Sequence, residues 1–207
     1  MDGKSLFITF EGIDGTGKST QVAILAERLR AFGFACVETR EPGGTVVAEK
    51  IRELLKSIRA IRWSAEVEIL LLTAARRDHV DQIIVPALKS GKIVICDRYL
   101  DSTRIYQGLS DSKIRAVIED IHERIIGISP DLTFILDLSP CLALERIRGR
   151  GIDDRYFESY GDKIELLRQG FLDLAREHPE RCLVVDASLP AAEIADIVYG
   201  EARKRCE

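Results

Sequence analysis

The chain has 207 residues and a formal net charge of −4, with 46% hydrophobic and 31% charged residues. This length and balance predict one globular domain over residues 1–207 with its own apolar core, and they argue against a nucleic-acid partner, which favours a basic protein. The five cysteines form no C-x-x-C pair, no signal peptide is evident and no apolar run approaches the ~18 residues of a membrane span, so we expect a cytoplasmic protein without disulfides, structural zinc or a membrane contact.

Strand-like and helix-like segments alternate from the start of the chain. The first half predicts a buried strand, a glycine-rich loop, a helix, a short strand, two amphipathic helices and a third strand. Their approximate bounds are Ser5–Phe10, Gly12–Ser19, Lys18–Phe32, Ala35–Glu38, Thr45–Ile58, Ser64–Ser90 and Lys92–Cys96. Pro86 is expected to disturb the end of the long helix, because proline lacks a backbone N–H.

The second half continues the alternation. A helix is expected to begin at Asp111, followed by a strand, two helices, a strand and a closing helix, at about Thr133–Leu138, Pro140–Gly149, Glu158–Glu177, Cys182–Asp186 and Pro190–Arg205. Apolar strands without polar alternation are buried on both faces, and their alternation with helices favours a parallel sheet. We therefore expect an α/β fold with a five-stranded parallel sheet and helices on both faces.

The glycine-rich loop matches the pattern G-x-x-x-x-G-K-[ST] between a predicted strand and a predicted helix. Glycines let successive backbone N–H groups converge on phosphates, and the helix N-terminus adds a favourable dipole. Lys18 would reach the terminal phosphates, and Ser19 would bind Mg²⁺. The predicted ATP-binding residues are Gly12, Ile13, Asp14, Gly15, Thr16, Gly17, Lys18, Ser19 and Thr20, with Arg146 from a second segment.

Asp97 closes the apolar run Ile93–Cys96 and is followed by Arg98. An acid at the carboxyl end of a buried parallel strand lies where open α/β sheets bind ligands, so Asp97 is predicted to assist the metal together with Ser19 or to orient the substrate. A solvated acid at a strand end is the alternative interpretation. Arg98 favours a binding site, because a planar guanidinium holds phosphate with two parallel hydrogen bonds.

An arginine-rich segment at about 146–157 contains Arg146, Arg148, Arg150 and Arg155 around two glycines. A basic helix face is the simplest interpretation of such a run. The glycines favour a hinged lid instead, which would bring positive charge to a moving phosphoryl group and exclude water.

Taken together, these motifs resemble the thymidylate kinase family in its bacterial form. The resembling segments follow the family's order and cover nearly the whole chain; they are Phe10–Thr20, Thr39–Thr45, Ala74–Arg76, Asp97–Tyr99 with Ser102, Tyr106 and Gln107, Arg148–Arg155, and Asp186–Ser188. The run Thr39–Thr45 (TREPGGT) is much more specific to this family than the glycine-rich loop Gly12–Ser19, the P-loop, which many kinases share.

The resemblance implies a P-loop kinase fold, a homodimer, and an ATP- and Mg²⁺-dependent phosphorylation of dTMP to dTDP. In the family's terms Arg98 would hold the dTMP phosphate, Arg76 would hydrogen-bond the thymine edge, and Tyr106 would crowd the 2′ position. The substrate-binding residues it implies are Asp14, Glu41, Pro42, Leu72, Arg76, Asp97, Arg98, Thr103, Tyr106 and Gln107.

The catalytic residues implied by the motifs and the resemblance are Lys18, Asp14, Arg98, Arg150 and Arg155. Some family members carry an arginine inside the P-loop, where this chain has Gly15. The lid would then supply the charge, with Arg150 as first choice and Arg155 as second. Leu72 stands where the family usually has a phenylalanine that stacks on thymine, so weaker dTMP binding is expected.

Two other functions remain open from the sequence. One is a different nucleoside or nucleoside monophosphate kinase. The other is a P-loop protein that binds nucleotide without transferring phosphate. No N-K-x-D guanine motif is present, which counts against a GTPase switch protein.

Overall fold

The computed structural model describes residues 5–57, 63–149, 161 and 163–206. Its five strands are β1 (Phe7–Glu11), β2 (Cys36–Arg40), β3 (Ile93–Asp97), β4 (Leu132–Asp137) and β5 (Cys182–Asp186). They form one sheet in the order β2-β3-β1-β4-β5, and every neighbouring pair is parallel. The predicted five-stranded parallel sheet is confirmed.

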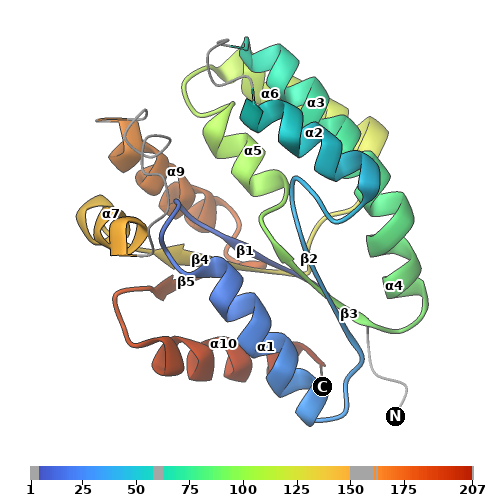
Figure 1. The fold of residues 1–207 in the computed structure, drawn as a ribbon, viewed down its shortest axis with the longest axis vertical. Helices are drawn as coiled ribbons and strands as arrows, with labels where there is room; N and C mark the ends of the chain where they lie inside the picture. The colour runs from blue at the N-terminus through green and yellow to red at the C-terminus, as the bar shows by residue number, and fades with distance from the viewer. Residues whose placement is uncertain (1–4, 58–62, 150–160, 162, 207) are drawn as a thin grey trace.

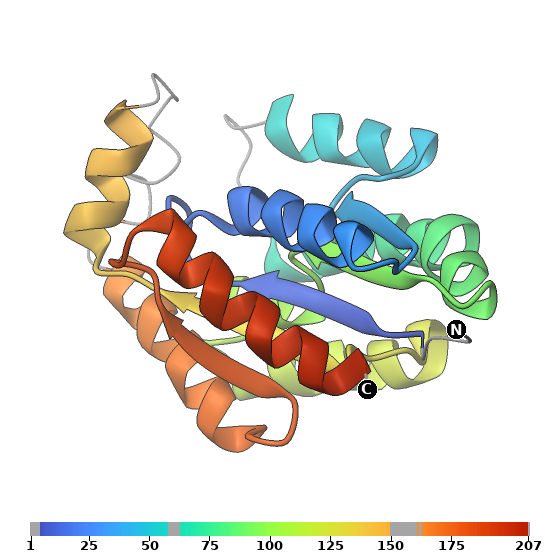
Figure 2. The ribbon, with the colours of Figure 1, turned by 90° about the horizontal axis from the view of Figure 1, so that it is seen from below.

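Helices cover both faces of the sheet (Figure 1). On one face α1 (Lys18–Ala31) and α10 (Ala191–Cys206) lie side by side, as Figure 2 shows from below. The other face carries a second set of helices. These are α3 (Ala65–His79), α4 (Val85–Lys89), α5 (Leu100–Tyr106), α6 (Ser112–Ile121) and α9 (Lys163–Glu177).

Two further helices lie at the margins of this arrangement. The helix α2 (Val46–Ser57) packs on α3 at the outside of the molecule, and α7 (Pro140–Gly149) follows β4 at the opposite side (Figure 1). No helix within the described ranges is long and apolar enough to cross a membrane.

The burial of β1 on both faces explains its unbroken apolar sequence. Ile8 belongs to an apolar cluster that includes Val22 and Leu25 of α1. Its neighbour Phe7 belongs to a second cluster, which includes Ile69 of α3. Successive side chains of a strand point to opposite faces, so a strand between two helical layers needs apolar residues at every position.

The predicted helix Ser64–Ser90 forms, but with a change of pitch. Ser64 caps α3 by accepting the N–H of Val67, and residues Val80–Ile84 form a π-helical turn between α3 and α4. Pro86 stands in the first turn of α4, directly after the π-helical turn, so the helix is disturbed near its end as expected. A proline ring clashes with the carbonyl four residues earlier, which accounts for the wider pitch there.

Two other features differ from the sequence interpretation, and a third predicted boundary is not tested. The strand β2 runs two residues beyond the predicted Glu38, to Arg40. The short helix α5 was not predicted at all. The third is the start of the helix predicted at Glu158–Glu177. Glu158 lies outside the described residues, within which α9 begins at Lys163.

Candidate active site

The carboxyl ends of β1, β2 and β3 are tied together at one edge of the sheet. Phe10 of β1 pairs with Asp97 of β3, and the Phe10 carbonyl accepts the N–H of Arg98 at 2.9 Å. The Glu41 N–H, just after β2, donates to the Asp97 carbonyl at 3.0 Å. Three segments far apart in the sequence therefore begin their loops at the same place.

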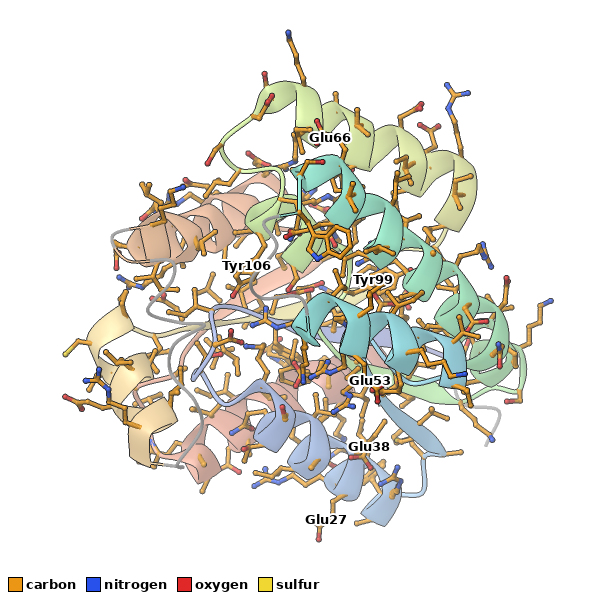
Figure 3. All side chains as sticks on the ribbon, turned by 45° about the horizontal axis from the view of Figure 1, so that its top comes forward. Glu27, Glu38, Glu53, Glu66, Tyr99 and Tyr106 are labelled. Carbon is orange, nitrogen blue, oxygen red and sulfur yellow. The ribbon has the colours of Figure 1, made fainter. Side chains whose placement is uncertain are left out.

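A cavity of about 580 Å³ opens at this edge. Most of the predicted site residues line it, namely Asp14, Gly15, Gly17, Lys18, Ser19, Glu41, Pro42, Leu72, Arg76, Asp97, Arg98, Thr103, Tyr106, Gln107 and Arg146. The predicted residues Gly12, Ile13, Thr16 and Thr20 do not line it. In Figure 3 the labelled Tyr99 and Tyr106 lie near the middle of the molecule, whereas Glu27 lies at its lower edge.

The P-loop packs tightly against α7. Gly15 has a φ of +85°, and a Cβ added there would lie 2.5 Å from the carbonyl oxygen of Ala143 in α7. Backbone atoms cannot yield as a side-chain tip can, so only glycine is compatible with this position of α7. The hydroxyl of Thr16 donates to the Ile13 carbonyl at 3.0 Å and holds the loop in shape.

Lys18 folds back onto the loop that carries it. Its Nζ donates to the Ile13 carbonyl at 2.8 Å and to the Gly12 carbonyl at 3.2 Å. Burial, followed by the charge of Arg98, lowers the pKa of Lys18 to about 8. Its third contact is with the Thr16 hydroxyl at 3.4 Å, so all of its partners are uncharged. A buried ammonium with uncharged partners gains strongly from an anionic ligand, because it has already lost its hydration.

Ser19 and Asp97 meet where the P-loop joins α1. The Ser19 hydroxyl donates to the Asp97 carboxylate. A hydroxyl and a carboxylate oxygen suit a hard cation such as Mg²⁺, which completes its shell with phosphate and water oxygens. Among the described residues no group of three or more metal-ligating side chains occurs, so protein atoms alone make no complete cage there.

Arg98 lines the cavity and is held there by side chains of the P-loop and of α5. Its guanidinium donates to Asp14 at 2.6 Å and to the Ser102 hydroxyl at 2.8 Å, and it lies over the Tyr106 ring at 5.1 Å. Burial opposes its charge, but Tyr106 and Asp14 outweigh this and raise the pKa of Arg98. The backbone φ of Arg98 is +71°, the left-handed region that side chains other than glycine rarely adopt.

Glu11, the last residue of β1, forms hydrogen bonds to the residues that follow Arg98. It was not predicted as a site residue. Its buried carboxylate accepts the Tyr99 N–H at 2.7 Å and the Ser102 hydroxyl at 2.6 Å. Because Ser102 gives its hydrogen to Glu11, its lone pairs face the Arg98 donor. Burial, followed by the charge of Asp101, raises the pKa of Glu11 to about 7.

The far end of the cavity is built around Arg76 of α3. Its Nε donates to Glu41 at 2.7 Å, its Nη2 donates to the Thr103 hydroxyl at 2.9 Å, and the guanidinium lies over the Tyr99 ring at 5.0 Å. Leu72, half-buried one turn earlier on α3, lines the same end. This arrangement offers N–H donors beside an apolar wall, which suits a flat, polar-edged ring.

Gln107 and Pro42 complete the wall of the cavity. The Gln107 side chain donates to Glu68 at 2.8 Å. Pro42 follows Glu41 through a cis peptide bond, and its carbonyl accepts a hydrogen bond from Arg52 at 2.8 Å.

Arg52 is a lining residue that the sequence interpretation missed. It extends from α2, and its burial, followed by the charge of Arg40, lowers its pKa. Asp97 and Arg98 both act on its charge, so it belongs to the same electrostatic centre. The only sequence signal was an arginine on the polar side of an amphipathic helix, which is also the position of a solvated one.

The predicted lid is described only at its start. Arg146 lines the cavity from α7. Arg150 and Arg155, and with them the predicted lid beyond Gly149, lie outside the described residues.

Comparisons with known proteins agree with this geometry. A family model described as thymidylate kinase matches residues 10–198. The chain is similar to the thymidylate kinase of Ruegeria pomeroyi, with 50% identity over 203 residues and 96% of both chains covered. It is also similar to that of Dinoroseobacter shibae, with 52% identity over 189 residues and 91% of both chains covered. Among solved structures, the thymidylate kinase from Ehrlichia chaffeensis is 36% identical, with a TM-score of 0.73 and coverage of 98% of this chain and 99% of that one.

Proposed function

Because this chain belongs to the thymidylate kinase family, we propose that it transfers the γ-phosphoryl group of ATP to dTMP, giving dTDP. One observation carries the proposal. The same cavity is lined by the P-loop lysine Lys18, by Arg98 and by the base-recognition candidate Arg76. A donor nucleotide at one end and an acceptor nucleotide at the other would meet at Arg98.

At the donor end, Lys18 and the backbone N–H groups of the P-loop would bind the β- and γ-phosphates of ATP. On binding, Lys18 would exchange the Ile13 and Gly12 carbonyls for phosphate oxygens. Ser19 and Asp97 would hold Mg²⁺, which when bound would neutralise charge on the phosphates.

At the acceptor end, Arg98 and Arg52 would hold the dTMP phosphate. The two guanidiniums belong to one electrostatic centre, and Asp14 keeps Arg98 in place until the phosphate arrives. Arg76 would donate to the edge of thymine, with Leu72 against its face, and Tyr106 would pack beside the sugar.

The chemistry needs no strong protein base, because the dTMP phosphate is already a deprotonated nucleophile at neutral pH. The protein would supply positioning and positive charge. A lid arginine, Arg150 first and Arg155 second, stays the predicted source of charge on the moving phosphoryl group.

We also propose that the chain acts as a homodimer through α2, α3 and α6. These helices lie side by side on the outside of the molecule (Figure 1). Exposed apolar side chains gather on them, namely Val46 and Val47 of α2, Val67 and Leu70 of α3, and Val117 of α6. Gathered apolar side chains of this kind mark protein interfaces.

A panel of acceptors tests the proposed activity. ATP-dependent ADP release is measured with dTMP, dUMP, dCMP, UMP, CMP and thymidine, and we expect dTMP to give the highest kcat/KM. Lys18→Ala is the control and should abolish turnover with every acceptor. A different best acceptor would favour another nucleotide kinase, and ATP binding without acceptor-dependent ADP release would favour a non-catalytic binding protein.

A further inference from the structure

His79 is a completely buried side chain that the proposed reaction does not use. It stands at the end of α3, three residues after Arg76, with an exposed fraction of 0%. Its Nδ1 lies 2.9 Å from Oε1 of Glu41, and its Nε2 lies 2.6 Å from the hydroxyl oxygen of Thr39. Both partners belong to the segment that ends β2.

The contact with Glu41 shows that Nδ1 of His79 carries a hydrogen. A carboxylate only accepts hydrogen bonds, so Nδ1 must donate to Glu41. The Thr39 hydroxyl, which can donate or accept, pairs with Nε2. Each ring nitrogen of His79 therefore has a hydrogen-bond partner.

Glu41 connects His79 to the base-recognition end of the cavity. One oxygen of its carboxylate accepts from His79, and the other accepts from Nε of Arg76 at 2.7 Å. Glu41 and Arg76 are only 5% and 4% exposed. A carboxylate held on both oxygens cannot rotate, so the plane of the Arg76 guanidinium is fixed as well.

A glycine allows the β2 segment to close over the imidazole. A Cβ added at Gly44 would lie 2.8 Å from the His79 ring and 2.7 Å from the Thr39 hydroxyl oxygen. The backbone φ there is +86°, which also favours glycine. The second glycine of the run Thr39–Thr45 therefore has a physical purpose in the contact with His79.

We propose that His79 is a positioning residue for Arg76, acting through Glu41. It holds the carboxylate so that Arg76 presents its remaining N–H groups to the base of the acceptor nucleotide. This inference rests on the proposed function, because it takes the ligand of Arg76 to be a pyrimidine base.

Two amide substitutions separate the contacts of His79. In His79→Asn the amide nitrogen replaces Nδ1 and keeps a donor for Glu41, while the contact with Thr39 is lost. In His79→Gln the amide replaces Nε2 and keeps the contact with Thr39, while the donor to Glu41 is lost. We expect His79→Gln to raise the KM for dTMP about tenfold or more, and His79→Asn to raise it by about threefold at most, because a lost hydrogen bond to a buried charge is the costlier one.

The KM for ATP should be unchanged in both variants, and melting temperatures show whether they fold equally well. A double variant gives the decisive readout. In an Arg76→Ala background, His79→Gln should produce no further rise in the KM for dTMP, because it acts only through Arg76.

Three outcomes would overturn the assignment: equal effects of Asn and Gln, a parallel rise in the KM for ATP, or additive effects in the Arg76→Ala background. Failure of the proposed function is distinguishable. It shows in the wild-type protein as a preference for another acceptor, and the same variants measured with that acceptor still test His79.

Discussion

The charge of Lys18 should make ATP binding at the P-loop depend on pH. Its pKa of about 8 lies below the usual value, so the free protein loses this positive charge as pH rises through about 8. Bound phosphates favour the charged form and raise the pKa again. ATP binding near and above pH 8 must therefore take up a proton, and ATP affinity should fall as the pH rises further.

Titration calorimetry of ATP binding in two buffers of different ionisation enthalpy measures this uptake. We expect proton uptake near pH 8 and none well below it. Lys18→Arg is the matched control, because arginine stays charged over this range and should show no uptake. ATP binding without any buffer dependence at pH 8 would show that Lys18 is already charged in the free protein.

Leu72 is expected to weaken the binding of the acceptor base. It covers the Arg76 end of the cavity without an aromatic face. Leu72→Phe should bind dTMP more tightly, because stacking of a base on an aromatic ring is worth ~1–3 kcal/mol in nucleic-acid sites. Calorimetry with dTMP measures the change, and an equal or weaker affinity of the variant would contradict it.

At the residue scale, the sequence predicted the site residues that a contiguous motif or a strand end defines. It missed those whose roles depend on partners far away in the sequence. Lys18, Ser19 and Asp97 were accessible because a contiguous motif and a strand end define them. Glu11 was missed because its partners lie in the turn after β3 and in α5, and Arg52 because its partner lies in the loop after β2. A single sequence does not show which side chains such loops bring together.

At the scale of elements, long periodic segments were predictable and short ones were not. The helix α3 begins at its predicted cap, Ser64. The helix α5 has only seven residues, too few for a periodic apolar pattern, and it follows directly on the left-handed Arg98 turn. Its position depends on that turn and on Glu11, both of which are tertiary features.

The helix α7 should depend on the glycine of the P-loop against which it packs. Gly15→Ala places a methyl group against the Ala143 carbonyl, so α7 must move and Arg146 must leave its place at the cavity. We expect a fall in kcat of about tenfold or more, because small misplacements of charged groups are costly in phosphoryl transfer. Steady-state kinetics with ATP and dTMP measures it.

Gly33→Ala is the control for the loss of a glycine with positive φ. Gly33 has a φ of +103°, lies away from the cavity, and has no atom within 4 Å of an added Cβ. It should lose stability without the fall in kcat. Equal kcat values in the two variants would show that the seating of α7 has no effect on the reaction.

At the scale of the molecule, alternation predicted a parallel sheet but not the order of its strands. That order places β3 between β1 and β2 and so brings Asp97 beside the P-loop. Strand order follows from how whole helices pack on the two faces, which no local pattern records. The resemblance to a family supplied the function that the fold alone leaves open.

The proposed dimer face predicts a clear contrast between two exposed leucines. Leu70 on α3 is 61% exposed and Leu166 on α9 is 62% exposed, but only Leu70 lies within the α2, α3 and α6 face. Leu70→Glu should yield a monomer in sedimentation velocity, because it buries a charge in an apolar interface. Leu166→Glu should sediment as the wild type does. A dimer that survives Leu70→Glu would move the interface elsewhere.

The contact between Gly15 and Ala143 also bears on how this chain differs from family members with an arginine in the P-loop. The family resemblance associates position 15 with an arginine in some members, and here the backbone of α7 occupies the space of any side chain at that position. A loop arginine at position 15 therefore requires α7 to move, so the single substitution Gly15→Arg should not by itself convert this chain to the other type.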